Sequence, residues 1–385
     1  MLREGERVTS LELFFDLVFV LALTQCTALI AATPTWESVF KAMLVLGVLW
    51  WAWVGYAWLT SVVDPEEGSV RLVMLAAMAA LLVAALCVPG AFGGDALLFA
   101  CAYGVVRAAH IGLFVLASRD DDALRSSVRG LALSTAVGVG LLFAAAAASS
   151  GLRLGLWTLA LVFDAGGPLL FGIDGWKLVP GHFAERHGAI IIIALGESVV
   201  AIGAGASGGV PIGVVAAAVV GTVVVGALWW LYFDIVAIVA GRRLAKAAQG
   251  RERNEIARDS YSYLHFPMIA GIALVAVGMK KTLAHVDDPL GFVAAAAMLG
   301  GTAMYLLAHI AFRWRNVHRF SVQRLVCAGL ALALLAVEAA LKPPSLLTLS
   351  LLAALLAGLI AYEVLHFAEL RDRIRHQLSS EVASG

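Results

Sequence analysis

Long apolar runs recur along the whole chain, separated by short polar segments. A transmembrane helix needs about 20 consecutive, predominantly apolar residues. Twelve segments meet this requirement, near residues 11–31, 38–62, 70–89, 95–118, 129–149, 153–172, 186–205, 211–241, 261–282, 289–312, 321–341 and 345–368. The connecting segments are too short for a soluble domain. The pattern predicts an all-α polytopic membrane protein with about twelve transmembrane helices.

Composition supports this class. Of the 385 residues, 61% are hydrophobic and 14% are charged, and the mean hydropathy is +0.91. A soluble globular domain would carry about 25% charged residues. The composition therefore excludes an ordinary soluble enzyme or binding domain.

Positive charge gives a predicted orientation, because cytoplasmic loops are enriched in Lys and Arg. If the chain starts in the cytoplasm, 21 of its 27 basic residues lie on the inside and 5 on the outside. Both termini are then expected to be cytoplasmic. The basic segment 242–258 is expected to meet anionic lipid headgroups. Net charge is zero, and no pattern points to nucleic acid.

Matching motifs predict an internal repeat. The pair Trp50–Trp51 recurs as Trp229–Trp230, 179 residues later, and His110 recurs as His309 after 199 residues. The halves would be 1–180 and 181–385, each with six spans and the same orientation, forming one integrated membrane domain. Parallel repeats of this kind occur in several transporter families. The alternative is chance similarity between Ala-rich apolar segments.

Charged side chains inside the predicted spans are the first candidates for function, since each costs at least about 2.5–3.5 kcal/mol at the bilayer centre. Glu12 and Asp16 lie four residues apart and therefore share one helix face. Glu12 follows Thr9 and Ser10, so a helix-capping role is its alternative interpretation.

The seventh span has the most polar entry in the chain, with His182, Glu185, Arg186, Glu197 and Ser198. Arg186 and Glu197 are eleven residues apart, which puts them on one face. Glu197 should lie near mid-membrane, where a carboxyl group is either neutral or paired with a cation. The candidate cations are Arg107 and the histidines, and whether Glu197 pairs with Arg107 stays open. In the repeat, Glu185 would correspond to Glu12.

Three further polar residues are expected to lie near the cytoplasmic side, at the same depth as Glu12, Asp16, His182 and Arg186. They are Asp234, His265 and His309. Aromatic residues are expected to line the same pocket: Phe15, Trp50, Trp51, Trp229, Trp230 and Tyr232. Alternatively, the tryptophans are bulky side chains that only pack between helices. The histidines would then be structural residues at helix interfaces, with their hydrogen bonds satisfied. The four cysteines lack metal-ligand spacing, and no cofactor motif is present, so neither a metal nor a cofactor is expected.

Two stretches carry a family resemblance. "LELFFDLVFVLALTQ" near the start and "HFAERHGAIIIIALGES" in mid-chain resemble the bacterial low temperature requirement protein A (LtrA) family, and the resemblance spans nearly the whole chain. It implies a multi-pass protein of the bacterial inner membrane, linked by name to growth in the cold, and it implies no mechanism. The positions that match the family motifs are Glu12, Phe15, Asp16, His182, Glu185, Arg186, Gly196, Glu197 and Ser198.

Three functions follow as hypotheses. In the first, the chain is a secondary transporter or permease in which Asp16 and Glu197 alternate between protonated and ionised states, in a hydrated pocket open to the cytoplasm between the first, seventh and eighth spans. Arg107 or Arg186 would bind an anionic solute or shift the pKa values of the two acids. In the second, a buried carboxylic acid catalyses a reaction on a lipid or isoprenoid. In the third, the protein supports growth in the cold without turnover. Transport is favoured over catalysis; the substrate and the oligomeric state stay open.

Overall fold

A computed structural model of the chain describes residues 7–206 and 210–367. It is 84% helical, and the described ranges contain no strand. The all-α class predicted from the apolar runs is therefore confirmed.

The helices follow one another with short connections. In the first half they are α1 (Ser10–Ala32), α2 (Trp36–Thr60), α3 (Gly68–Leu86), η1 (Val88–Gly90), α4 (Ala96–Ala117), α5 (Asp122–Ala147) and α6 (Ser150–Leu170). In the second they are α7 (Pro180–Gly205), α8 (Ile212–Phe233), α9 (Val236–Lys246), α10 (Arg251–Ile256), η2 (Ala257–Tyr263), α11 (His265–Ala284), α12 (Phe292–Val317), α13 (Val322–Leu341) and α14 (Ser345–His366).

Among the described residues, eleven helices are long and apolar enough to cross a membrane, with α8–α9 and α10–α11 each counted as one. The remaining long helix, α6, has 21 residues and packs against α5 and α2. Its polar residues include Arg153 and Asp164, which lower its hydropathy. The protein is thus a polytopic membrane protein, and α6 brings the long helices to the predicted twelve.

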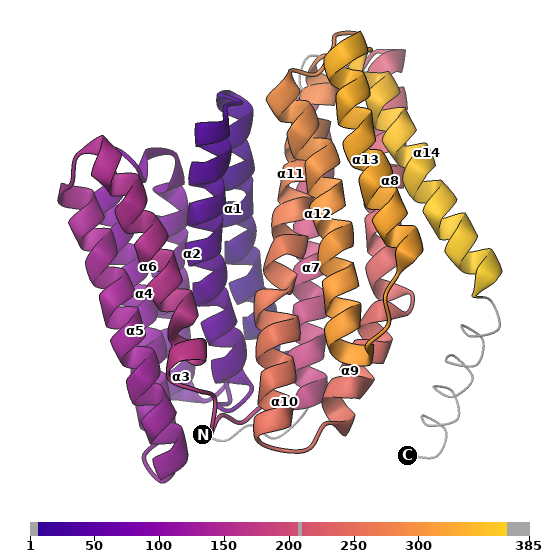
Figure 1. Ribbon diagram of the computed structural model, residues 1–385. Helices are drawn as coiled ribbons and strands as arrows, with labels where there is room; N and C mark the ends of the chain where they lie inside the picture. Colours follow the sequence, from indigo (N-terminus) through magenta and orange to yellow (C-terminus); the bar gives the residue numbers. More distant parts are fainter. Residues whose placement is uncertain (1–6, 207–209, 368–385) are drawn as a thin grey trace.

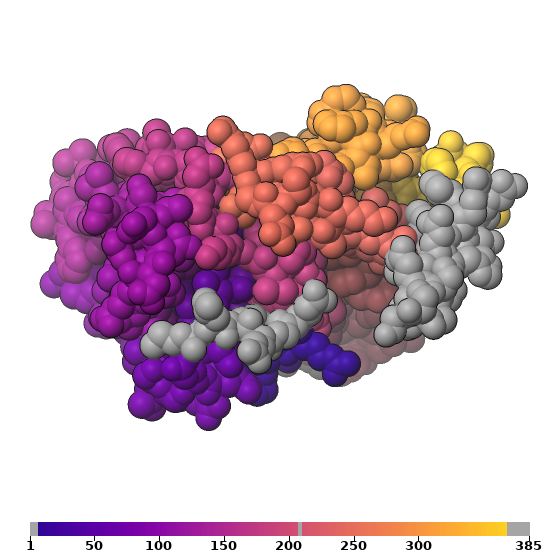
Figure 2. Space-filling view, turned by 90° about the horizontal axis from the view of Figure 1, so that it is seen from below, coloured from indigo at the N-terminus to yellow at the C-terminus, as the bar shows by residue number. Residues whose placement is uncertain are grey.

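One predicted span differs. The apolar run 211–241 is not one helix, because α8 ends at Phe233 and α9 begins at Val236. The short helix α9 carries Arg243 and Lys246 in its last turn. Figure 1 and the view from below in Figure 2 place α9 and α10 at one end of the bundle. A helix with strongly basic residues is better accommodated at a membrane surface than in the hydrocarbon core.

The helices form two groups side by side, α1–α6 and α7–α14 (Figure 1). Helix pairs that pack in the first group are α1–α2, α1–α3, α3–α4, α4–α5, α5–α6 and α2–α6; the equivalent pairs α7–α8, α7–α11, α11–α12, α12–α13, α13–α14 and α8–α14 pack in the second. The groups meet where α1 and α2 contact α7 and α11. The internal repeat stays a prediction, which this correspondence supports.

The π-helical turn η2 leads into α11 and projects polar groups into the bundle. The carbonyl of Ser262 accepts a hydrogen bond from Trp50 Nε1, and its hydroxyl accepts one from Trp58 Nε1, both at 2.9 Å. Two of the α2 tryptophans are therefore bonded to one residue of the second half. Turns of this type often occur at functional sites.

The tightest helix contact is between α11 and α12. A Cβ atom at Gly301 would lie 2.7 Å from the Gly271 carbonyl oxygen, and one at Gly271 would lie 2.6 Å from the Gly301 oxygen. Small residues allow such close approach between membrane helices.

We therefore expect Gly301→Ala to lower the unfolding temperature in detergent, because overpacking a close contact costs about 1–3 kcal/mol. Gly300→Ala is the matched control, since a Cβ atom there meets nothing within 4 Å. Equal unfolding temperatures for the two variants would show that the α11–α12 contact tolerates separation.

Candidate functional site

The first turn of α1 presents Glu12 to two environments. Its Oε2 accepts a hydrogen bond from the backbone N–H of Thr9 at 2.9 Å, while the Thr9 hydroxyl accepts one from the Glu12 N–H. Its Oε1 faces the interior, 2.8 Å from His182 Nε2 and 3.2 Å from Arg186 NH1. The sequence offered helix capping and a buried charged site as alternatives for Glu12. The structure shows both in one carboxylate, with one oxygen in each role.

Arg186 joins three helices. Besides Glu12 of α1, its NH1 donates to the Tyr56 carbonyl of α2 at 3.3 Å and to the Thr60 hydroxyl. Its NH2 lies 3.3 Å from Asp16 Oδ1. The side chain is 0% exposed, and a buried guanidinium requires charged or dipolar partners on several sides. These contacts supply them.

Aromatic rings cover the faces of the guanidinium. Its carbon lies 5.8 Å from the centre of the Phe15 ring and 5.5 Å from that of Trp53. Such cation–π contacts strengthen when water is excluded. Phe15 therefore lies beside the cluster. Trp53 does so too, although the repeated tryptophan pair of α2 had pointed only to Trp50 and Trp51.

Asp16 is incompletely satisfied. Its Oδ1 accepts from Trp53 Nε1 at 2.6 Å and from Arg186, whereas its Oδ2 has no hydrogen-bond partner among the described residues. The same holds for Arg186 Nε. Buried polar atoms are nearly always bonded, so each exception requires an explanation. A catalytic or proton-binding role is one.

A layer of histidine and aromatic rings continues from this cluster. The His187 ring lies 5.0 Å from that of Trp53 and 5.1 Å from that of His265. His265 Nε2 is 2.8 Å from the Tyr232 hydroxyl, and the Tyr232 ring lies 5.8 Å from that of His309. The predicted residues His265, His309 and Tyr232 are therefore brought into one buried layer. His187 connects them to the cluster.

Glu197 lies elsewhere on the same interface. It accepts from Thr24 at 2.5 Å and from Thr27 at 2.7 Å. Fifteen residues separate it from His182 on α7, which is about 22 Å along a helix. At both places, a residue of α1 contacts a residue of α7 that lies 170–174 positions later in the chain. Because this offset stays nearly constant along the helices, α1 and α7 run parallel. Ser198 is buried beside Glu197, and its hydroxyl has no partner among the described residues.

Arg107 does not pair with Glu197. Its NH2 lies 2.6 Å from Asp164 Oδ1 on α6 and bonds Thr135 on α5, and Tyr103 donates to the other oxygen of Asp164 at 2.5 Å. The sequence had left this pairing open, because partners are decided by which helices are neighbours. Asp164 was missed, although it lies inside the predicted span 153–172 and the same charge criterion would have found it.

A further ionic group closes the layer at its other end. Arg324 of α13 contacts Glu363 of α14 through Nε and NH2, at 2.8 and 2.9 Å, and its NH1 lies 2.9 Å from His309 Nδ1. Asp234 lines a cavity of about 250 Å³ beside this group. Neither Arg324 nor Glu363 was singled out from the sequence.

Two expected pocket members have other surroundings. Glu185 is exposed and accepts from the Val8 N–H at 3.3 Å, so it does not resemble the buried Glu12. Trp229 is 44% exposed, because it lies on the outer face of α8. The other tryptophans face inward: Trp50 and Trp51 are buried, Trp51 stacks on Tyr263, and Trp230 lines the cavity beside Asp234.

The expected hydrated pocket shared by Asp16, Glu197 and Asp234 was also wrong. Asp16 is 0% exposed and Glu197 2%, so no space for water adjoins the first and little adjoins the second. Asp234 lines a separate cavity. The buried groups that do gather are Glu12, Asp16, His182 and Arg186, which form the α1–α7 cluster.

Comparisons with known proteins agree with the sequence motifs. The family model described as bacterial low temperature requirement A protein (LtrA) matches residues 7–361. A protein of Rhizobium meliloti (strain 1021), described as uncharacterized, is 31% identical over 318 residues, covering 77% of this chain and 74% of the relative. No solved structure matches significantly.

The α1–α7 cluster generates a stability prediction. Arg186→Met would leave two carboxylates buried without their shared cation, a loss of about 3–5 kcal/mol. We expect a marked fall in the unfolding temperature in detergent. The triple variant Glu12→Gln/Asp16→Asn/Arg186→Met should recover much of it, and Glu185→Gln, next in sequence and exposed, should match wild type. An unchanged Arg186→Met protein would contradict the cluster's stabilising role.

Proposed function

The chain belongs to the bacterial low temperature requirement A family, and on that premise we propose that it is a secondary transporter that couples proton movement to a small solute. The α1–α7 cluster would act as the coupling site. The same proposal places the protein in the bacterial inner membrane with both termini in the cytoplasm.

One observation carries the proposal: a buried carboxylate, Asp16, shares its arginine with Glu12 and keeps one oxygen without a partner. A proton arriving at Oδ2 would neutralise Asp16 and weaken its contact with Arg186. In a water-excluded site such a change in charge alters the interaction strongly. Protonation therefore changes the strength of the α1–α7 contact.

The position of this contact suits a transporter. α1 and α7 begin the two predicted halves, and they lie where the two groups of helices meet. In transporters built from repeats, one half moves against the other around a fixed site. A proton-dependent ionic contact between the halves would bias that movement. The buried Asp16 corresponds to a closed state, which opens when the contact weakens.

Glu197 is proposed as a second proton site on the same interface. It is held by two α1 hydroxyl groups, Thr24 and Thr27. When ionised, a carboxyl group there accepts from both hydroxyls; when protonated, its O–H can donate to one of them while its other oxygen still accepts. Protonation of either acid would therefore alter the α1–α7 contact, each at its own depth along the helices.

We also propose that anionic lipid headgroups bind the basic segment 242–258. Part of its charge is compensated internally, since Arg243 pairs with Glu252, Arg251 with Glu255 and Arg258 with Asp259. The attraction would therefore be weaker than the six basic residues of the segment suggest.

The lipid- or isoprenoid-directed enzyme gains no specific support. Its acid would need a substrate within reach, and Asp16 and Glu12 adjoin no open space. Of the tryptophans expected to stabilise a cation, Trp229 faces outward and Trp50 donates its N–H to Ser262.

The proposal is tested without knowing the solute, by applying pH jumps to proteoliposomes on a solid-supported membrane. Proton binding inside the membrane displaces charge, so the wild type should give a transient current. Asp16→Asn and Glu197→Gln should each reduce it, and the double variant should abolish it. Glu185→Gln is the control, because this acid is exposed. A wild-type transient in the double variant would remove both acids from proton coupling.

A further inference from the structure

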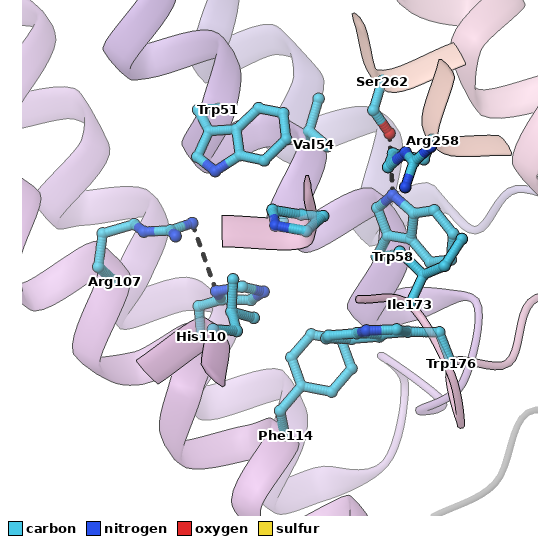
Figure 3. A pocket seen from close by; sticks show the side chains of 13 residues that line it. Trp51, Val54, Trp58, Arg107, His110, Phe114, Ile173, Trp176, Arg258 and Ser262 are labelled. Carbon is cyan, nitrogen blue, oxygen red and sulfur yellow. Dashed lines mark hydrogen bonds between the residues drawn. The ribbon is translucent and has the colours of Figure 1, made fainter. Parts of the chain in front are cut away.

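A cavity lies on one face of α2 (Figure 3). The α2 residues that contact the α1–α7 cluster, Trp53 and Thr60, lie on the other face by helical spacing. It has about 40 Å³ of space for the centres of water molecules, enough for a few waters or one small ion. Aromatic side chains form much of its wall: Trp51, Trp58, Phe114 and Trp176. Arg107 and His110 project into it from α4.

The charged side chains that line this cavity are both cationic. Among the described residues they are Arg107 and Arg258, and no carboxylate lines the cavity. Asp164, which pairs with Arg107 NH2, is not among the lining residues. Arg258 is held at its Nε by Asp259 and is 17% exposed, so it lies nearer the surface than Arg107, which is 1% exposed.

Two N–H groups of residues in the wall lack well-aligned acceptors. Arg107 Nε has no partner among the described residues. His110 Nδ1 lies 3.5 Å from Arg107 NH1, and because a guanidinium only donates, the imidazole proton is assigned to Nε2. That atom lies against the backbone of Gly55, and it has no well-aligned acceptor in the described part of the chain. Both residues are 1% exposed, so neither N–H is satisfied by bulk water.

Gly55 makes room for this arrangement. A Cβ atom at Gly55 would lie 2.7 Å from His110 Cε1 and 3.0 Å from Arg107 NH1. A larger residue would push both donors out of place. The space beside the donors therefore depends on a residue without a side chain.

We propose that this cavity binds a small, planar, monovalent oxyanion, such as nitrate, bicarbonate or the carboxylate of a short organic acid. Arg107 NH2 is already bonded to Asp164 and Thr135, so an oxyanion here would accept from the Arg107 Nε–H and from His110. A flat anion fits the small space between the aromatic side chains. A strongly hydrated dianion such as sulfate would lose more hydration in an apolar site than the donors replace. This inference rests on the transport proposal only in naming the bound anion as the transported solute.

Tyr56 connects the cavity to the proton site through α2. Its ring lies 4.7 Å from Phe15 on one side and 5.4 Å from His110 on the other. Its hydroxyl donates to the Val106 carbonyl at 3.0 Å, and its own carbonyl accepts from Arg186. Movement of Arg186 on protonation of Asp16 would therefore shift a residue that contacts the wall of the anion cavity.

Isothermal titration calorimetry of the purified full chain in detergent tests binding directly. At constant ionic strength, sodium nitrate and sodium formate should each give a saturable heat, and sodium sulfate should give none. His110→Phe keeps the ring and removes the donor; it should weaken nitrate binding by about tenfold or more, the effect of losing one hydrogen bond to a charged group. His285→Phe is the control, since His285 is 66% exposed and remote in sequence.

If His110→Phe fails to fold, Gly55→Ala supplies the second variant, because its methyl group displaces the same donors. Absence of saturable nitrate or formate heat in wild type, saturable sulfate heat of similar affinity, or unchanged affinity in the folded variant would overturn the anion site. Binding needs no gradient, so this failure is distinct from failure of proton coupling. A wild-type pH-jump transient in Asp16→Asn/Glu197→Gln with normal nitrate binding would sink only the transport proposal.

Discussion

The guanidinium of Arg186 imposes the strongest constraint on this fold. A cation with no exposed surface must be compensated where it lies, and here the compensation comes from Glu12 and Asp16 of α1 and from a carbonyl and a hydroxyl of α2. Phe15 and Trp53 cover its faces. Because these partners belong to α1 and α2, the position of α7 against these two helices follows from satisfying one side chain.

The same constraint sets the register of the α1–α7 interface. With Glu12 opposite His182 and Arg186, parallel helices necessarily place Thr24 and Thr27 opposite Glu197. Other buried ions form separate pairs within each half, as Arg107 does with Asp164 and Arg324 with Glu363. Lipid supplies no hydrophobic driving force between helices, so such polar contacts contribute to choosing helix neighbours. The α1–α7 contact differs because it joins the two halves.

α2 separates two polar sites that share its side chains. One face presents Trp53, Tyr56 and Thr60 towards Arg186, and the other presents Trp51, Gly55 and Trp58 towards the cavity. The π-helical turn η2 holds this helix by accepting the N–H groups of Trp50 and Trp58 on Ser262. The proposed proton site and the proposed anion site would lie on opposite faces of one helix, with Tyr56 in contact with both, which gives coupling between them a physical basis.

The membrane class, the number of long helices and the choice of Glu12, Asp16 and Arg186 as candidate site residues could all be predicted from the sequence. These follow from local properties: the length of apolar runs, the cost of charge at bilayer depth and the spacing of residues around a helix. Only the tertiary structure decided which charges meet. It paired Arg107 with Asp164, separated Glu197 and Asp234 from Asp16, and turned Glu185 and Trp229 outward. The reason is that contacts depend on the neighbours, rotation and relative depth of helices, and residues far apart in the chain fix these together.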